Sequence, residues 1–502
     1  MKTHKLNLTL FVFLFISQMS FAQNGYITSE EKNFKELTSY NEITAFVETI
    51  TNQFPFVKSE IIGKSVQGKN IYALKFSKGQ FGKDKTKLKV LLFAQQHGNE
   101  PAGKEGALLL IKELIKPEHR HFLNQMDIAI IPQMNPDGAE KNQRRNANDM
   151  DLNRNHLIMT EPETISLHAF FDHYLFDVTV DIHEYSPYGD EWKSYGYRKN
   201  SRIMVGASTN TNVFVELRKF SNEIVLPDLF KKLKSKNISS FVYCPGGPPE
   251  IDYIRHSTFD VNDGRQSFGI MNTLSFIQEG MNGIESEFSD LKMRSLTQKE
   301  SLMGFLEIAE ENAIQIKQLV QEGRSQLFEE SDHSILSIQA DHFNNGQILE
   351  LPLLSYTTSH DTIVKVVDYR PVVKSTFDIY KPLGYLIPKN DSILLNWINR
   401  EGYLTKKPKK STMLGYERYH IKQIDSIDFE RDIIINPVIQ KQVLKQEPDL
   451  DNFLYIPCNQ LKGNKLALAL EPKSMLSLGT YKEFKHLIKK GVAYPVLRVI
   501  KK

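Results

Sequence analysis

The strongest constraint on the fold is an alternation of buried strands and amphipathic helices that extends from about residue 37 to residue 323. Residues 87–95 (KLKVLLFAQ) form a mostly apolar run typical of a buried strand, and residues 103–116 (GKEGALLLIKELIK) have the spacing of an amphipathic helix. Further buried strands are predicted at residues 127–132, 176–182 and 273–278. Strands that alternate with helices in this way predict a layered α/β domain.

A long helix is predicted at the end of this region, at about residues 300–323. Thr297 followed by Glu300 fits a capping box, in which the two side chains accept hydrogen bonds from backbone N–H groups of the first turn. We therefore expect one continuous helix that begins next to this pair.

From about residue 331 the sequence changes to short β-rich segments, such as residues 362–368 (TIVKVVD) and 493–500 (AYPVLRVI). A chain of 502 residues also exceeds one ordinary domain. We therefore predict an α/β domain over residues 23–330 and a smaller accessory domain, α+β or β-rich, over residues 335–502. The sequence indicates no role for this second domain.

The N-terminal segment, residues 1–22, differs from the rest of the chain. Basic residues precede an apolar run over residues 6–16, and Ser20-Phe21-Ala22 supplies small residues at the −3 and −1 positions. This pattern is typical of a cleaved secretory signal. The run is shorter than the roughly 20 residues that span a bilayer. We therefore expect export to the periplasm or the medium, with no stable membrane insertion after cleavage.

Charge and cysteine content narrow the function further. The chain has a formal net charge of +3, and the predicted signal contains two lysines and no acidic residue, which leaves +1. Such a balance gives no reason to expect a nucleic-acid partner. Cys244 and Cys458 are the only cysteines, which excludes a disulfide scaffold. We expect both to be unpaired or buried, because they fall in different predicted domains.

A candidate metal site begins at His97-Gly98-Asn99-Glu100-Pro101, which lies between a predicted buried strand and a predicted helix. Open α/β sheets bind ligands at the carboxyl ends of their strands. A His and a Glu three residues apart at such a turn can both point at one ion, and catalytic zinc sites commonly have three protein ligands. This short motif alone also fits a structural histidine.

Four more polar clusters lie near strand ends, and each has an ordinary explanation when taken alone. Asn-Pro-Asp-Gly is good turn chemistry, and paired arginines often lie on a solvated surface, although they also suit carboxylate binding. The four clusters are residues 135–138 (NPDG), 144–155 (RRNANDMDLNRN), 181–184 (DIHE) and 275–280 (SFIQEG). Five such clusters in one α/β domain indicate a shared site.

The order of these clusters resembles the zinc carboxypeptidases of the pancreatic carboxypeptidase A type. Residues 39–50 and 62–77 also resemble the segment that opens the catalytic domain of this family, so the resemblance covers roughly residues 36–320. It implies a mixed central β-sheet flanked by helices, one zinc ion, and peptide or protein C-termini as substrates. Because the matching region follows the predicted signal almost directly, we do not expect the inhibitory pro-domain of the digestive enzymes.

The resemblance implies a metal-binding role for four residues. His97 and Glu100 match the first two zinc ligands of the family, and His183 matches the third. Asp151 matches a carboxylate that orients a ligand histidine, and such partners fix the tautomer of the ring.

It also implies roles in substrate binding and catalysis. Asn153 and Arg154 match the pair that binds the C-terminal carboxylate of the substrate. Arg144 matches the arginine that polarises the scissile carbonyl, and Glu279 matches the general base. The family also has a tyrosine about 22 residues before the base; that position is Ser257 here, with Tyr253 close by.

Two alternatives have different functions. Related zinc enzymes with similar HGNE and DLNR motifs hydrolyse murein peptides or N-acylamino acids, but the NPDG segment and Arg144 favour a peptidase. A non-catalytic binding protein on this scaffold should lack a metal ligand or the base. The positions that such a protein would lose are all present: His97, Glu100, His183, Arg144 and Glu279.

Overall fold

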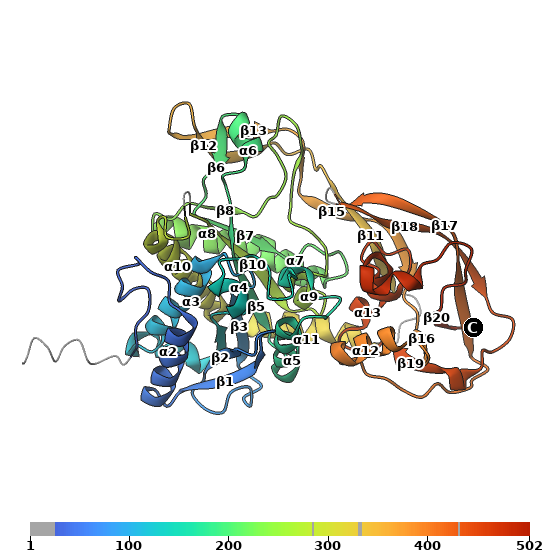
Figure 1. The fold of residues 1–502 in the computed structure, drawn as a ribbon. Helices are drawn as coiled ribbons and strands as arrows, with labels where there is room; N and C mark the ends of the chain where they lie inside the picture. Colours follow the sequence, from blue (N-terminus) through green and yellow to red (C-terminus); the bar gives the residue numbers. More distant parts are fainter. Residues whose placement is uncertain (1–25, 284–285, 330–333, 430–431) are drawn as a thin grey trace, which may run out of the picture.

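The computed structural model describes residues 26–283, 286–329, 334–429 and 432–502 (Figure 1), so the predicted signal peptide lies outside the described residues. The α/β domain is built on an eight-stranded sheet with the strand order β1-β2-β4-β3-β5-β10-β7-β8. Its central strands β4, β3, β5 and β10 are parallel. β1 and β2 pair antiparallel with their neighbours, and β7 pairs antiparallel with β10 but parallel with β8. Helices lie on both sides of this mixed sheet, as predicted.

The strands of the sheet follow the apolar segments of the sequence closely. Every residue of β3, β4 and β10 is buried. Burial on both faces explains the mostly apolar sequences of β3 and β4, whereas β10 also carries buried polar residues. The strands are β1 (Val57–Lys64), β2 (Asn70–Phe76), β3 (Leu88–Ala94), β4 (Met126–Ile131), β5 (Val178–Tyr185), β7 (Ile203–Ala207), β8 (Ser240–Val242) and β10 (Leu274–Met281).

The helices of this domain are mostly short, and several begin directly after a strand-end loop. They are α2 (Tyr40–Gln53), α3 (Pro101–Leu114), α4 (Pro136–Glu140), α5 (Pro162–Tyr174), α6 (Asp190–Ser194), α7 (Val215–Phe220), α8 (Leu226–Ser235), α9 (Gly264–Gly269), α10 (Leu291–Glu311) and α11 (Ala313–Phe328). None of the helices in the described ranges is long and apolar enough to cross a membrane.

The predicted single helix at residues 300–323 is wrong. Two helices, α10 and α11, occupy this region and meet at Asn312, where the backbone leaves the helical conformation. The Asn312 side chain donates to the carbonyl oxygen of Ile308 (2.9 Å), a local hydrogen bond that competes with helix continuation. Thr297 lies inside α10 and donates to the Arg294 carbonyl, so the predicted capping box does not form.

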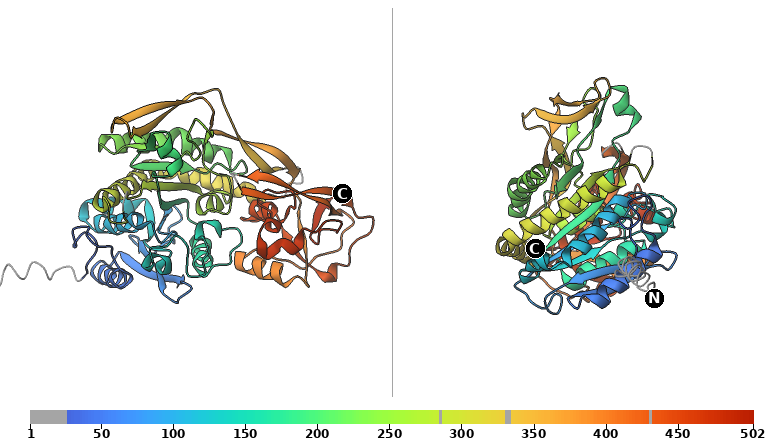
Figure 2. Two further views of the ribbon diagram at one scale, coloured as in Figure 1. Left: turned by 45° about the horizontal axis from the view of Figure 1, so that its top comes forward. Right: turned by 90° about the vertical axis from the view of Figure 1, so that its left-hand side faces the viewer.

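The C-terminal region is rich in β-structure, as predicted, and lies beside the α/β domain (Figure 2). Its largest sheet has the order β18-β17-β20-β16-β19, and two helices pack near it. The elements are β11 (Ile335–Phe343), β12 (Leu349–Ser355), β13 (Asp361–Val366), β14 (Tyr369–Arg370), β15 (Val372–Tyr380), β16 (Gly384–Pro388), α12 (Ser392–Glu401), β17 (Leu414–Phe429), β18 (Asp432–Val443), β19 (Phe453–Pro457), α13 (Gly463–Leu470) and β20 (Leu497–Lys501).

The two regions share strands and core. β12 pairs with β6 (Tyr197–Lys199), and β14 pairs with β9 (Ile254–Arg255), so the C-terminal region completes two small sheets with strands of the preceding domain. One hydrophobic cluster contains side chains from both regions. Cys244 and Cys458 are both buried and unpaired, as expected.

Candidate active site

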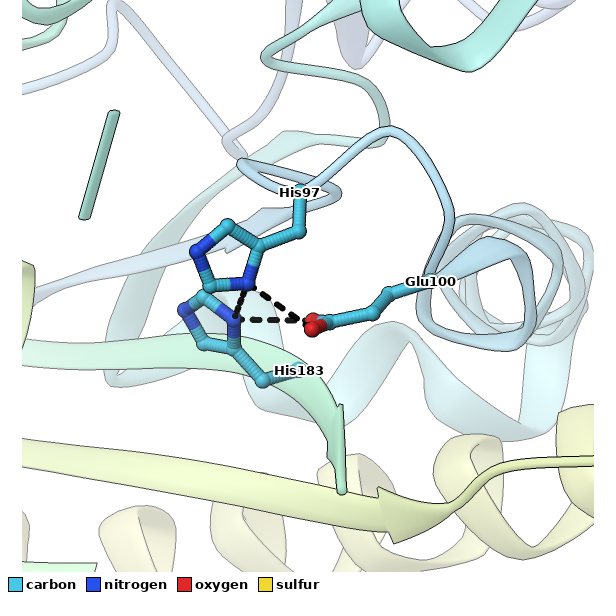
Figure 3. Close-up of side chains that lie close together, drawn as sticks. All are labelled: His97, Glu100 and His183. Carbon is cyan, nitrogen blue, oxygen red and sulfur yellow. Dashed lines mark hydrogen bonds and ion pairs between the residues drawn. The ribbon is translucent and has the colours of Figure 1, made fainter. Parts of the chain in front are cut away.

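Three side chains converge at the carboxyl ends of β3 and β5 (Figure 3). His97 Nδ1 lies 2.8 Å from one Glu100 oxygen, and His183 Nδ1 lies 2.9 Å from the other. The two histidine nitrogens are 3.1 Å apart. All three side chains are buried. The structure therefore brings together the three residues that the sequence pointed to as metal ligands.

Local structure places each ligand. The loop after β3 carries His97, and Glu100 is the residue immediately before α3, where Pro101 occupies the first helical position. Proline is favourable there because the missing N–H would have no partner in the helix. His183 lies within β5, so its position is set by a strand in the middle of the sheet.

A carboxylate lies behind each histidine. Asp151 is 3.0 Å from His97 Nε2, on the ring nitrogen opposite the cluster. Asp181 is 2.8 Å from His183 Nε2 in the same way, and Gln96 donates to both Asp181 oxygens (2.9 and 2.8 Å). The sequence resemblance assigned Asp151 to a ligand histidine but did not identify Asp181. Asp181 could have been identified, because it lies two residues before His183 and residues two apart on a strand point to the same face of the sheet.

The donor set fits a divalent cation such as zinc. Burial alone would lower the pKa of both histidines, yet the charge of Glu100 and of the aspartates behind the rings raises the pKa of His97 and of His183. Burial would raise the pKa of Glu100, but the charges of the two histidines lower it. The cluster therefore favours positive charge at its centre. Two imidazoles and a carboxylate are also the ligand types that zinc takes in hydrolytic sites.

Glu279 lies beside the cluster on β10. In the parallel pairing of β10 with β5, Glu279 is the register partner of His183. Burial raises the pKa of Glu279 to about 7, with an opposing effect of His183 and a smaller reinforcing one of Glu100. A carboxyl group with a raised pKa beside a metal site has the properties of a proton carrier.

A cavity of about 280 Å³ connects these groups. His97, Glu100 and Glu279 line one part of it, and Arg144, Asn153 and Arg154 line another. Six of the eight residues singled out in the sequence therefore line one cavity. The other two contact lining residues: His183 lies 2.9 Å from Glu100, and Asp151 contacts His97 and Arg144.

The polar residues of this cavity are held in fixed positions. Arg144 donates through Nε to Asp151 (2.9 Å), and its terminal nitrogen lies 3.2 Å from His97 Nδ1. Arg154 donates to the carbonyl oxygen of Asn153 (2.8 Å), and burial there is opposed by the charges of Asp151 and Asp260, so its pKa is raised. The Asn153 side chain accepts from the Gly264 N–H (2.8 Å).

Two tyrosines, Tyr185 and Tyr243, line this cavity, and neither was identified from the sequence. Tyr243 directly follows β8, a three-residue strand without a periodic pattern. Burial raises its pKa, and Glu279 adds to that shift. Ser257 also lines the cavity, whereas Tyr253 lines an adjoining one, where the Arg370 guanidinium lies 3.9 Å from the centre of its ring.

The NPDG segment forms the short helix α4, with Asn135 as its N-cap accepting from the Gly138 N–H (2.9 Å). This segment packs directly under the loop of His97. A Cβ atom on Gly98 would lie 2.2 Å from the carbonyl carbon of Gly138, so the two backbones meet without side chains between them. The segment therefore supports the metal-binding loop.

Comparisons with known proteins agree with this geometry. Residues 43–236 match the family model described as zinc carboxypeptidase. "Carboxypeptidase 2" of Trichophyton tonsurans is 22% identical over 428 residues, covering 82% of this chain and 77% of that protein. Human "Carboxypeptidase D" is 25% identical over 277 residues, covering 48% of this chain and 20% of that protein.

Among solved structures, a metallo-carboxypeptidase from Burkholderia cenocepacia matches 54% of this chain and 69% of its own, with a TM-score of 0.43 and 18% identity. Taken with the ordered motifs around the cavity, the sequence matches show that residues 43–236 form a zinc carboxypeptidase domain, and they support the assignment of the chain as a metallocarboxypeptidase.

Proposed function

We propose that the protein removes the C-terminal residue from peptides or proteins, using one zinc ion held by His97, Glu100 and His183. The observation that carries this proposal is the convergence of these ligands with Glu279 and Arg154 in one cavity. A bound zinc ion supplies positive charge that makes water a nucleophile near neutral pH and polarises the scissile carbonyl. Substrate binding, orientation of the carbonyl and proton transfer would be carried out by side chains of the cavity.

Arg154 and Asn153 would bind the free carboxylate at the end of the substrate. Arginine presents parallel N–H donors that match a carboxylate, and Arg154 lines the cavity together with the metal ligands His97 and Glu100. The side chain of Arg144 would donate to the oxygen of the scissile carbonyl as negative charge develops there. Asp151 accepts a hydrogen bond from the Arg144 Nε, and a terminal nitrogen of Arg144 lies close to the metal ligand His97.

Glu279 would take the proton from the attacking water and return it to the leaving amine. Its buried position on β10 keeps the carboxylate in place beside His183. A pKa near 7 suits both halves of this transfer, since the group can accept a proton and then give it up.

The test of the base is Glu279→Gln. Removal of a general base typically lowers turnover about 10²- to 10⁴-fold. We expect this loss in kcat with the zinc content unchanged, measured by hydrolysis of a blocked dipeptide and by metal analysis. The surface variant Glu311→Gln is the matched control. Unchanged turnover in Glu279→Gln would reject the assignment.

A zinc amidase or deacylase of the same fold is the alternative function. An exopeptidase that uses Arg154 needs a free C-terminal carboxylate, whereas an amidase acting within a murein peptide does not. Peptides with free and with amidated C-termini should therefore differ strongly in rate. Equal cleavage of both would favour the alternative, and zinc binding without any cleavage would favour a non-catalytic binding protein.

We also propose that the protein is exported, to the periplasm or the medium. The support is the signal-like pattern of residues 1–22, together with helices that, over the described ranges, do not include a membrane span. N-terminal sequencing of the protein from cell envelope and medium should begin at Gln23. A chain that retains Met1 in the cytoplasm would contradict export.

A further inference from the structure

A second and larger cavity, of about 790 Å³, adjoins the metal-site cavity. Arg255 lines both of them. A third cavity, of about 490 Å³, shares Arg154 and Thr258 with the metal-site cavity and shares Phe429 and Met475 with the second one. The three cavities therefore share walls and lie next to one another, and together they form a cleft beside the metal ligands.

Both regions of the chain form the walls of the second cavity. Trp192, Tyr253 and Phe259 come from the α/β domain, while β11 and the end of β17 contribute the opposite wall, including Phe429. The two walls are joined by a hydrogen bond of His342 Nε2 with the Ser257 carbonyl oxygen (3.1 Å). Substrate that extends from the metal site into this cavity would lie against the C-terminal region.

The second cavity is acidic and aromatic. Among the described residues that line it, four carboxylates face one guanidinium, that of Arg255: Glu191, Asp252, Asp341 and Asp428. Burial and the nearby charge of Arg255 lower the pKa of His342 to about 4, so this histidine is neutral near pH 7. Two further cations lie on rings that line the cavity. Arg370 lies on the Tyr253 ring and is bound to Asp368 (2.8 Å), and Lys199 lies 5.2 Å from the centre of the Trp192 ring and donates to the Cys244 carbonyl oxygen (2.8 Å).

We propose that this cavity binds the residues that precede the scissile bond and selects lysine or arginine side chains among them. The proposal rests on the proposed carboxypeptidase function, which places the last residue of the substrate at Arg154 and directs the preceding residues outward. A cationic side chain there meets the four carboxylates, and the aromatic rings offer cation–π contacts and apolar surface for its methylene groups. The C-terminal region then has a role in substrate selection.

The experiment uses the zinc-loaded full chain and two blocked pentapeptides with the same last two residues. One has lysine and the other glutamate at the third and fourth positions from the C-terminus. We expect kcat/KM to be about tenfold higher for the lysine peptide at low salt and the difference to shrink as salt screens the charges. A blocked dipeptide serves as the test of C-terminal cleavage itself, because it does not reach the second cavity.

Two variants connect the preference to the cleft. Asp341→Asn combined with Asp428→Asn should bring the ratio of lysine to glutamate rates close to one. Asp425→Asn, an exposed carboxylate on the same strand as Asp428 that does not line the cavity, should keep the ratio. Equal rates for the two pentapeptides with active dipeptide hydrolysis would overturn the inference alone. No cleavage of any substrate would instead overturn the proposed function on which it rests.

Discussion

At the scale of single residues, the buried carboxylate of Asp181 has the clearest consequence for the metal. It lies 2.8 Å from His183 Nε2 and is itself held by Gln96, with no exposure to solvent. Such a partner orients the ring and increases its basicity as a ligand. The position of His183 in the cluster therefore depends on a residue that does not reach the cavity.

We predict that Asp181→Asn weakens zinc binding. Loss of a carboxylate behind a ligand histidine typically costs about 10- to 100-fold in metal affinity. Competition with a chromophoric chelator measures this directly. Asp149→Asn, an exposed carboxylate in the loop that also carries Asp151, is the control and should bind zinc normally. An unchanged affinity in Asp181→Asn would contradict this role of the carboxylate.

At the scale of elements, strand β11 contacts the loop near the cavity through His342. This side chain is buried, and burial together with Arg255 lowers its pKa from 6.5 to about 4. The folded state therefore binds a proton less readily than the unfolded state. The resulting stability is fully present above pH 6.5 and is lost as the pH falls toward 4.

We predict that the free energy of unfolding falls further in wild type than in His342→Gln when the pH is lowered from 7.5 to 4.5. The expected difference between the two falls is about 2 to 3 kcal/mol, since one pKa unit corresponds to about 1.4 kcal/mol. The comparison cancels the titration of the other groups. Urea-induced unfolding at both pH values gives the two free energies of unfolding. His360→Gln, at an exposed position of the same region, should track wild type. Parallel behaviour of wild type and His342→Gln would refute the prediction.

Some helices and strands could be predicted from the sequence and others could not. The strands β3 and β4 were predictable because both of their faces are covered, which favours continuous apolar runs. β5 and β10 are buried as well, but they carry polar residues between their apolar ones. The long helix was mispredicted because Thr297 and Glu300 satisfy a local capping pattern inside a helix that starts earlier. A local motif carries no information on the packing that extends α10 toward its N-terminus.

The site was predictable where motifs lie next to strand ends and was missed where only the fold brings residues together. His97 and Glu100 are neighbours in sequence, and Glu279 closes a strong apolar run. By contrast, Tyr243 follows the short strand β8, which has no periodic pattern of its own. The pairing of β6 with β12 joins segments about 150 residues apart, a distance over which a single sequence gives no contact information.

At the scale of the whole molecule, a buried ion pair fastens the C-terminal region to the back of the metal site. Lys465 of α13 lies 2.7 Å from Glu401 of α12, and both side chains are fully buried. Lys465 also donates to the backbone carbonyl of His156 (2.6 Å), a residue 309 positions earlier. His156 in turn contacts Gln96, which holds Asp181.

We predict that Lys465→Met destabilises the protein by about 3 to 5 kcal/mol, because Glu401 then remains buried without its nearest cation. The double variant Lys465→Met with Glu401→Leu should regain more than half of this loss, since it removes both charges together. Urea-induced unfolding supplies the free energies. A double variant no better than the single one would mean that the hydrogen bond to His156, and not the charge pair, holds the two regions together.

Removal of zinc should lower the thermal stability of the entire chain. Binding to the folded state alone contributes about 4 kcal/mol when free zinc exceeds its dissociation constant a thousandfold. We expect the unfolding temperature to fall with EDTA and to recover when zinc is added back, as measured by calorimetry. The variant His97→Gln should respond to neither treatment. An EDTA response of equal size in His97→Gln would place the stabilising ion elsewhere.

The contact of Gly98 with Gly138 also limits how this protein can evolve. Most packing faults can be corrected by making the opposite side chain smaller. Here the opposite residue is already a glycine, and a Cβ on Gly138 would itself lie 2.5 Å from the carbonyl oxygen of Arg145. A mutation at either position therefore has no second-site remedy within the pair. Lineages that keep the catalytic loop must inherit the two glycines together, although 40 residues separate them in the chain.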